Sequence, residues 1–199
     1  MKFLIATHNP HKLEELARIL KPLGIEAVTD RDLGLTLTEA DETGETFAEN
    51  AFLKAEMACR ESGLPAVADD SGLCVDALGG APGVYSARYA PEGQLCSTLL
   101  RNLADVPADK RGAHFVSSVC CVFPNGDTVT AEGTCDGVIA DACRGESGFG
   151  YDPVFETAGG RTFAELLPAE KDAISHRGRA LAKFSERLKA YLEKERPSC

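Results

Sequence analysis

The sequence predicts an α/β protein with a mixed sheet, and two observations carry this prediction. Near the N-terminus, short apolar segments alternate with amphipathic helical patterns, which is typical of βα units. In the middle of the chain, two segments rich in Val, Ser, Thr and Cys flank a turn sequence at 124–127, which predicts an antiparallel hairpin. Parallel βα units and an inserted hairpin together require a sheet with both strand directions.

The first βα unit is predicted to be a strand over 3–6, a turn, and a helix that begins at Pro10. Asn9 is a favourable N-cap residue, and proline is well tolerated at the first helical position. Lys12 is unusual because the helix dipole disfavours a cation in the first turn. An anion such as a phosphate bound there explains Lys12 as well as a solvated surface position does.

The next predicted elements are a strand over 25–28, a helix, and a strand over 65–68 that ends at Asp69-Asp70-Ser71-Gly72. Thr46 and Glu49 have the spacing of a capping box at the start of this helix. Its expected inner face consists of Ala51, Phe52, Ala55, Ala58 and Cys59. Later expected elements are a helix through 95–100, hairpin strands over 115–123 and 128–131, a glycine-rich loop over 145–150, and a long amphipathic C-terminal helix.

Composition bounds the classes of partner. The chain has 199 residues with 44% hydrophobic content, enough for one large core or two small lobes in a single domain over 1–199. Its net charge of −10 argues against a nucleic-acid polymer or an anionic membrane as partner. Because there is no apolar run of bilayer length and the N-terminal apolar segment is too short for a signal peptide, we expect a cytoplasmic protein.

The eight cysteines do not have the spacing of a metal site or a disulfide framework. No Cys-x-x-Cys pair occurs, and Cys59, Cys74 and Cys120 lie among apolar residues. We therefore expect structural thiols in a reducing compartment, rather than a thiol-rich metal-binding module.

Two acidic pairs, Asp41-Glu42 and Asp69-Asp70, are candidates for chemistry. The second follows an apolar strand, where alternation lets one carboxylate face a ligand while the other holds the loop. A carboxylate there suits Mg²⁺. The alternative is a solvated turn, because Asp-Asp-Ser-Gly is common turn chemistry. Lys54 is predicted to be solvated by default, with contact to a phosphate as the alternative.

A second group of candidates lies near the C-terminal helix. His176 and Arg177 are placed at a helix start where the dipole favours acids, and Lys171 lies just upstream. Cations at two helix starts indicate a ligand with several phosphates, for which arginine offers directional donors. Phe149 lies between two glycines and could stack on a base; the alternative is packing in the core.

In combination, these segments resemble the inosine triphosphate pyrophosphatase family over nearly the whole chain. The matching segments are ATHNPHK (6–12), ETG (42–44) with Phe47 and ENA (49–51), ADDSGL (68–73), LGGAPGVYSARY (78–89), GFGYDP (148–153) and ISHRG (174–178). Two positions depart from the family, His8 and Ser147, where glycine is frequent. His8 bears on the geometry of its loop, whereas Ser147 lies outside the recognition segments.

The resemblance implies a two-lobed fold with the active-site cleft between the lobes, a homodimer, and Mg²⁺-dependent hydrolysis of dITP, ITP and XTP to monophosphate and pyrophosphate. Asp70 is the implied catalytic carboxylate and a metal ligand. Asp41 is the first choice for the second metal carboxylate, with Glu42 as the alternative. The implied substrate-binding residues toward the phosphates are Thr7, His8, Asn9, Pro10, His11, Lys12, Lys54 and Lys171. Ser71 is implied to contact the substrate, Phe149, Gly150, Tyr151 and Asp152 to frame the base, and His176 and Arg177 to contact the edge of the base.

Two other functions fit the same residues. One is a pyrophosphatase with a different base preference, such as the related Maf-type proteins that act on modified pyrimidines. The other is a non-catalytic nucleotide sensor, which the presence of Asp70, Lys12 and Arg177 disfavours.

Overall fold

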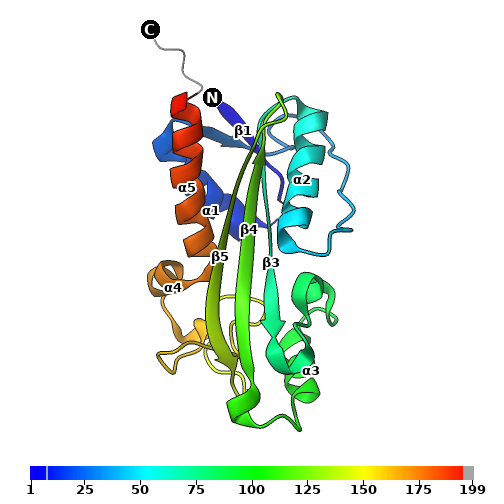
Figure 1. The fold of residues 1–199 in the computed structure, drawn as a ribbon, viewed down its shortest axis with the longest axis vertical. Coiled ribbons are helices and arrows are strands. Elements are labelled where there is room, and N and C mark those ends of the chain that lie inside the picture. Colours follow the sequence, from blue (N-terminus) through cyan, green and yellow to red (C-terminus); the bar gives the residue numbers. More distant parts are fainter. Residues whose placement is uncertain (8, 195–199) are drawn as a thin grey trace. The chain divides into compact units, whose positions relative to one another are not determined.

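The chain forms a six-stranded mixed sheet with helices on both faces (Figure 1). The computed structural model describes residues 1–7 and 9–194. The strands lie in the order β2-β1-β3-β4-β5-β6. Their bounds are β1 Lys2–Ile5, β2 Glu26–Val28, β3 Ala66–Val75, β4 Gly112–Val122, β5 Thr128–Ile139 and β6 Phe155–Glu156. Strand β1 is parallel to β2 and β3, whereas β6 is antiparallel to β5. The predicted α/β class with a mixed sheet is confirmed.

The α-helices are α1 Pro10–Leu20, α2 Phe47–Ser62, α3 Leu95–Asn102, α4 Pro168–Ile174 and α5 His176–Lys194. Helix α2 begins with the predicted capping box, in which the Thr46 hydroxyl accepts from the Glu49 N–H and the Glu49 carboxylate accepts from the Thr46 N–H. It ends at Gly63, whose φ of 68° is the left-handed conformation that glycine adopts at low cost.

The chain forms two compact units. Unit 1 consists of Met1–Asp70, Ser117–Gly133 and the chain from Ala180 onward, and unit 2 of Ser71–Val116 and Thr134–Arg179. The unit boundaries fall within β3, β4 and β5, so these strands contribute residues to both units. A single domain over 1–199 and a cleft between lobes stay predictions.

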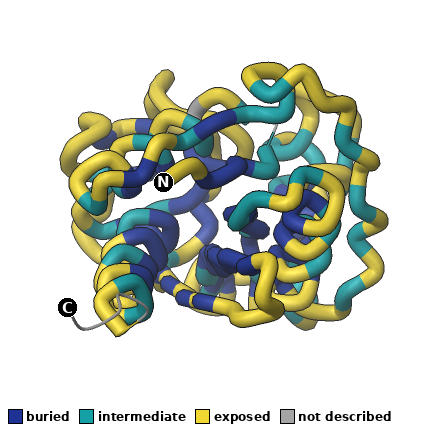
Figure 2. Tube along the Cα trace, turned by 90° about the horizontal axis from the view of Figure 1, so that it is seen from above, coloured by how far each residue is buried: buried dark blue, intermediate teal, exposed yellow. Residues whose placement is uncertain are grey.

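The core of unit 1 has two apolar clusters, because β1 is buried on both faces. Phe3 and Ile5 pack with residues of α1 and α5, including the fully buried Phe184. Leu4, which alternation places on the opposite face, packs with Ala51 and Ala55 of α2. Figure 2 marks the buried stretches of the trace in dark blue and the exposed stretches in yellow.

The core of unit 2 is built on aromatic rings. The Phe115 ring lies 4.7 Å from the Phe155 ring and 5.7 Å from the Phe163 ring, measured between centroids. Leu99 of α3 belongs to the same cluster. This packing supports the loop between β5 and β6, which carries the Gly-Phe-Gly-Tyr-Asp-Pro segment.

Two expectations about the elements were wrong, and two elements were missed. Strand β3 does not end at Asp69 but continues through Gly72 to Val75, so the Asp-Asp-Ser-Gly segment is a buried strand rather than a solvated turn. Phe52 is 37% exposed instead of lying on the inner face of α2, because the small residues Ala51 and Ala55 fill that face. Helix α4 and strand β6 were not predicted.

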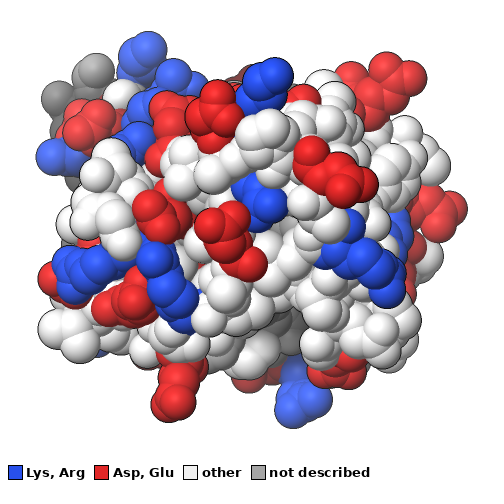
Figure 3. Space-filling model, turned by 90° about the horizontal axis from the view of Figure 1, so that it is seen from below, with Lys and Arg blue, Asp and Glu red and all other residues white. Residues whose placement is uncertain are grey.

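Within the described residues, no helix has the length and apolar character to cross a membrane. On the face drawn in Figure 3, acidic and basic side chains are interspersed and no continuous basic patch forms.

Candidate active site

The first group of candidate residues is centred on Asp70 in unit 1. Its side chain is buried, and Oδ1 lies 2.9 Å from the Lys54 Nζ. The same ammonium group lies 3.1 Å from Oε1 of Glu42. Lys54 is therefore not the solvated lysine expected by default: it joins two carboxylates, and only 19% of its side chain is exposed.

Burial and charge set the protonation of this group. Burial raises the pKa of Asp70, and the neighbouring Lys54 ammonium only partly offsets the effect. Burial lowers the pKa of Lys54, but the carboxylates of Asp70 and Glu42 outweigh it and the net shift is upward. Lys54 is thus a stable cation beside a carboxylate that takes up a proton more readily than an ordinary aspartate.

The carboxylates of Glu42 and Asp70 fit a magnesium ion. They are hard oxygen donors that converge on one ammonium nitrogen, and Mg²⁺ commonly binds to one or two carboxylates while substrate phosphate and water complete its shell. No cluster of three or more His, Cys, Asp or Glu side chains with metal-binding geometry occurs among the described residues. Asp41, the first choice of the acidic pair, is exposed, whereas Glu42 contacts the Lys54 ammonium.

Asp69 forms an ion pair with Lys12 of the predicted phosphate loop. Its Oδ2 lies 2.8 Å from Nζ of Lys12, and only 3% of its side chain is exposed. The loop itself is ordered by its own polar atoms: the Asn9 N–H donates to the Thr7 hydroxyl at 3.2 Å, and the Lys12 N–H approaches Oδ1 of Asn9 at 3.4 Å. The prediction that Asn9 caps helix α1 is thus confirmed. His8 and the side chain of His11 lie outside the described residues.

The second group of candidates lies in unit 2 around Phe149, which is 43% exposed and so is not the core residue of the alternative interpretation. Two cations lie against its ring: Nζ of Lys171 at 5.1 Å and Cζ of Arg177 at 5.5 Å from the centroid. Arg177 also donates to the Ser71 hydroxyl at 3.2 Å. The structure therefore brings together the predicted residues Ser71, Phe149, Lys171 and Arg177.

Asp152 holds this group in place rather than presenting a free carboxylate. Its buried Oδ2 accepts from the Phe149 N–H at 2.8 Å and pairs with Nζ of Lys171. Gly148 has a φ of 78°, and a Cβ there would lie 2.0 Å from Oδ2 of Asp152. Only glycine fits at Gly148, and Gly150, with a φ of 62°, adopts the same left-handed conformation.

Tyr151 and His176 are both buried in unit 2. The Tyr151 hydroxyl donates to the Ser86 carbonyl at 2.9 Å, and the His176 ring stacks on Phe115 with centroids 4.6 Å apart. The predicted cap at the start of α5 is confirmed, since the Ser175 hydroxyl accepts from the Gly178 N–H at 3.0 Å.

Comparison with known proteins decides the family. A sequence profile of the Ham1 family matches residues 3–187. The chain belongs to the Ham1 family. The family resemblance inferred from the motifs is confirmed.

Several relatives of this Ham1 chain carry the name dITP/XTP pyrophosphatase. The one from Symbiobacterium thermophilum is 47% identical over 194 residues, covering 96% of this chain and 97% of the relative. The one from Mannheimia succiniciproducens is 50% identical over 198 residues, covering 95% and 98%. Among solved structures, a HAM1 protein from Coxiella burnetii has a TM-score of 0.86 at 38% identity, covering 98% and 99% of the two chains.

Sequence reasoning missed two polar residues that support the site of this Ham1 chain. Asn50 contacts Asp70, and the Ser86 hydroxyl accepts from the Leu73 N–H at 2.9 Å while donating to the Gly83 carbonyl at 2.6 Å. A signal for Asn50 existed, since it lies four residues before Lys54 and therefore on the same helix face. For Ser86, no local pattern indicates a buried position.

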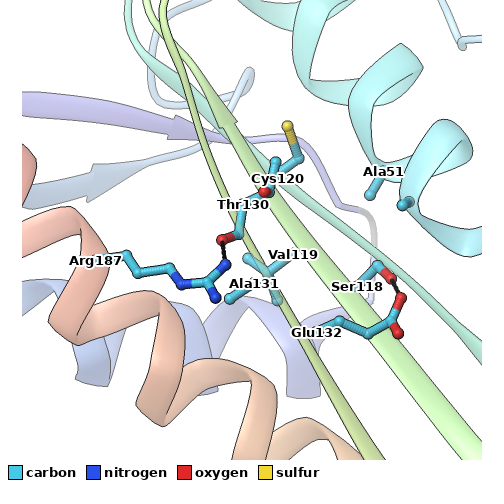
Figure 4. Close-up of a pocket in the computed structure, with 9 residues that line it drawn as sticks. Ala51, Ser118, Val119, Cys120, Thr130, Ala131, Glu132 and Arg187 are labelled. Atoms are coloured by element: carbon cyan, nitrogen blue, oxygen red, sulfur yellow. Dashed lines mark hydrogen bonds between the residues drawn. The ribbon is translucent and has the colours of Figure 1, made fainter.

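A cavity of about 120 Å³ lies in unit 1 (Figure 4). Its walls come from α2, β4, β5 and α5, and none of the predicted site residues lines it. Ser118 and Glu132 are hydrogen-bonded to each other at 2.7 Å, and Arg187 donates to the Thr130 carbonyl at 2.6 Å. The side chains of Ser118, Glu132 and Arg187 are thus engaged with one another or with backbone.

Proposed function

We propose that this Ham1 chain hydrolyses the non-standard purine nucleoside triphosphates dITP, ITP and XTP to monophosphate and pyrophosphate. The observation that carries the proposal is the buried Asp70, whose carboxylate shares the Lys54 ammonium with Glu42, in a chain 47% identical to a protein named dITP/XTP pyrophosphatase. A raised pKa on a buried carboxylate suits a group that accepts a proton from water.

In this proposal, Asp70 takes a proton from the attacking water. The water oxygen forms a bond to the α-phosphorus, and the bond from this phosphorus to the bridging oxygen breaks, so that pyrophosphate leaves. Lys12 and Lys54 bind the phosphates of the substrate and stabilise the charge that develops on the leaving group. A Mg²⁺ ion, when bound by Glu42 and Asp70, would add electrostatic stabilisation of the phosphate oxygens.

The group around Phe149 is proposed to bind the base. The exposed ring offers a stacking surface, and Arg177 offers N–H donors to the 6-oxo group of hypoxanthine or xanthine. Adenine carries an amino donor at the same position, so it would leave an arginine donor unpaired and bind less well.

Product analysis tests the proposal. The purified protein with Mg²⁺ is given ITP, dITP, XTP, GTP, ATP and dTTP in parallel, and the products are separated. We expect monophosphate and pyrophosphate from ITP, dITP and XTP, with much slower turnover of ATP and GTP. Orthophosphate as the product, or equal hydrolysis of ATP, would contradict the proposed reaction or specificity, and preference for a pyrimidine would favour the Maf-type alternative.

The Asp70→Asn variant tests the role of the carboxylate. Asparagine is nearly isosteric but is a far weaker base, so kcat for ITP is expected to fall about 100-fold or more. Direct binding of ITP to the variant, measured by calorimetry, controls for loss of the site. Normal turnover by a variant that binds ITP would show that another group activates the water.

The homodimer and the cytoplasmic location are also proposals, and they rest on the resemblance and on the composition. Light scattering that gives a mass of about 42 kDa, twice the 21.2 kDa of one chain, is the expected result for the dimer.

A further inference from the structure

Asn50 lies fully buried in the first turns of α2 and has two polar partners. Its Nδ2 lies 3.4 Å from Oδ2 of Asp70. Its Oδ1 accepts from the Gly44 N–H at 2.8 Å. The amide thus connects the strand that carries Asp70 to the loop that carries Glu42, which lies two residues before Gly44.

The loop is pressed against Asn50 so closely that its contact residue can only be glycine. A Cβ at Gly44 would lie 2.6 Å from Cβ of Glu49 and 2.7 Å from Oδ1 of Asn50. The absence of a side chain brings the Gly44 N–H within hydrogen-bond distance of the Asn50 amide. This close approach fixes the distance between the backbone of the loop and helix α2.

Two bridges therefore run side by side from one face of α2. Lys54, four residues after Asn50, joins Oδ1 of Asp70 to Oε1 of Glu42. Asn50 joins Oδ2 of Asp70 to the backbone of the Glu42 loop. The bridge through Lys54 is charged, and the bridge through Asn50 is neutral.

The difference in charge matters when substrate binds. A divalent cation held by Glu42 and Asp70 would repel the Lys54 ammonium, and a bound phosphate would attract it away from the carboxylates. The neutral amide of Asn50 is not repelled in this way. Because its other end is held by the Gly44 backbone, it can keep the separation of the two carboxylates after the charged bridge is lost.

We propose that Asn50 is a positioning residue that holds Asp70 and the Glu42 loop at the separation a divalent cation requires. The inference rests on the proposed function for the role of the metal. It identifies a buried amide, outside the groups that would touch substrate, as a determinant of metal affinity. Partners of this kind, which orient metal ligands from behind, typically change metal affinity or activity 10–100-fold when removed.

The test is direct binding of Mn²⁺, as a paramagnetic substitute for Mg²⁺, to the nucleotide-free protein. In the Asn50→Ala variant we expect Mn²⁺ affinity to fall about 10–100-fold. With ITP as substrate, the Mg²⁺ concentration for half-maximal rate is expected to rise by a similar factor, while KM for ITP at saturating Mg²⁺ changes little. Asn50→Leu, which fills most of the vacated volume, replaces the alanine variant if that variant does not fold.

Cys59→Ser is the matched control. It places a hydroxyl in the apolar cluster under α2 and lowers stability, but it lies more than two turns after Asn50 on the helix. Its Mn²⁺ affinity should equal that of the wild type even where its melting temperature is as low as that of Asn50→Ala. Equal losses of Mn²⁺ affinity in both variants would show a merely structural role and overturn the inference.

The outcomes separate this inference from the proposed function. A wild-type protein that hydrolyses none of the nucleotides contradicts the function, whereas the Mn²⁺ titration still reports on Asn50. A wild type that is active but binds no Mn²⁺ without nucleotide, or an Asn50→Ala variant with unchanged Mn²⁺ affinity, overturns the inference alone.

Discussion

Asp69 and Asp70 are consecutive residues of β3 with different partners. Successive side chains of a strand point to opposite faces, so Asp69 pairs with Lys12 and Asp70 with Lys54. A buried carboxylate is costly unless it is paired, and each of these two has a lysine within 3 Å. Unit 1 thus contains two lysine–carboxylate pairs on consecutive residues of one strand.

The charge of Asp152 is expected to affect substrate binding, because it holds Lys171. Asp152→Asn keeps an acceptor for the Phe149 N–H but removes the charge that holds Lys171. We expect KM for ITP to rise about tenfold, about 1.4 kcal/mol of binding, with a smaller change in kcat, because lost ground-state binding acts mainly on KM. Initial-rate kinetics at saturating Mg²⁺ measure this. Glu146→Gln, an exposed change in the same loop, is the control, and an unchanged KM in Asp152→Asn would contradict the proposed role of Lys171.

Among the elements, side chains of helix α5 provide hydrogen-bond donors to backbone carbonyls of strand β5. Within unit 1, Lys183 and Arg187 of α5 donate to the carbonyls of Glu132 and Thr130 on β5, at spacings of four residues on the helix and two on the strand. These contacts occupy backbone acceptors that would otherwise face water at the strand edge. Helix α5 is therefore held by charged side chains as well as by its buried apolar face.

Helix α4, which carries Lys171, depends on Glu170. The Glu170 carboxylate accepts from Arg161 at 2.9 Å and from the Leu167 N–H at 2.9 Å, and these bonds, that of Arg161 first, lower the pKa of Glu170. A lowered pKa stabilises the fold above the ordinary carboxyl pKa of about 4.3, and this contribution is lost as pH falls through the lowered value.

The Glu170→Gln variant measures this contribution. We expect a lower melting temperature than wild type at pH 7 and a difference that shrinks toward zero as the pH falls below 4. Glu186→Gln, an exposed change on α5, should show no such trend. A difference for Glu170→Gln that is constant from pH 7 to pH 3 would contradict the assignment.

At the scale of the whole molecule, the two units share strands. Strand β3 contributes Val67 to a core cluster of unit 1 and Leu73 to that of unit 2, and β4 contributes Val119 and Phe115 in the same way. Unfolding of one core would disorder strands that also carry residues of the other core. We therefore expect a single cooperative domain over 1–199.

Calorimetry tests this single domain. We expect one unfolding transition whose calorimetric and van't Hoff enthalpies agree. Addition of ITP analogues with Mg²⁺ should raise the midpoint of the whole transition rather than split it. Two resolved transitions in the free protein would show that the units unfold separately.

Local chemistry explains which elements could be predicted. The Asn9 cap, the Thr46 capping box and the turn at 124–127 each depend on a few neighbouring residues, so their positions follow from the sequence. The course of β3 could not be predicted, because Asp-Asp-Ser-Gly favours a turn on its own. Burial against neighbouring elements and the pairing of both carboxylates with lysines outweigh that local preference.

Fold class, family and the residue types of the candidate site follow from local features of the chain, because periodicity, caps and motif order are encoded in neighbouring residues. The partners of the polar side chains follow only from the folded chain: Glu42 rather than Asp41 shares Lys54 with Asp70, Asp152 holds Lys171, and Asn50 contacts Asp70. Each of these contacts joins residues 12 to 20 positions apart. Which charges meet across such separations depends on packing between elements, which no local pattern specifies.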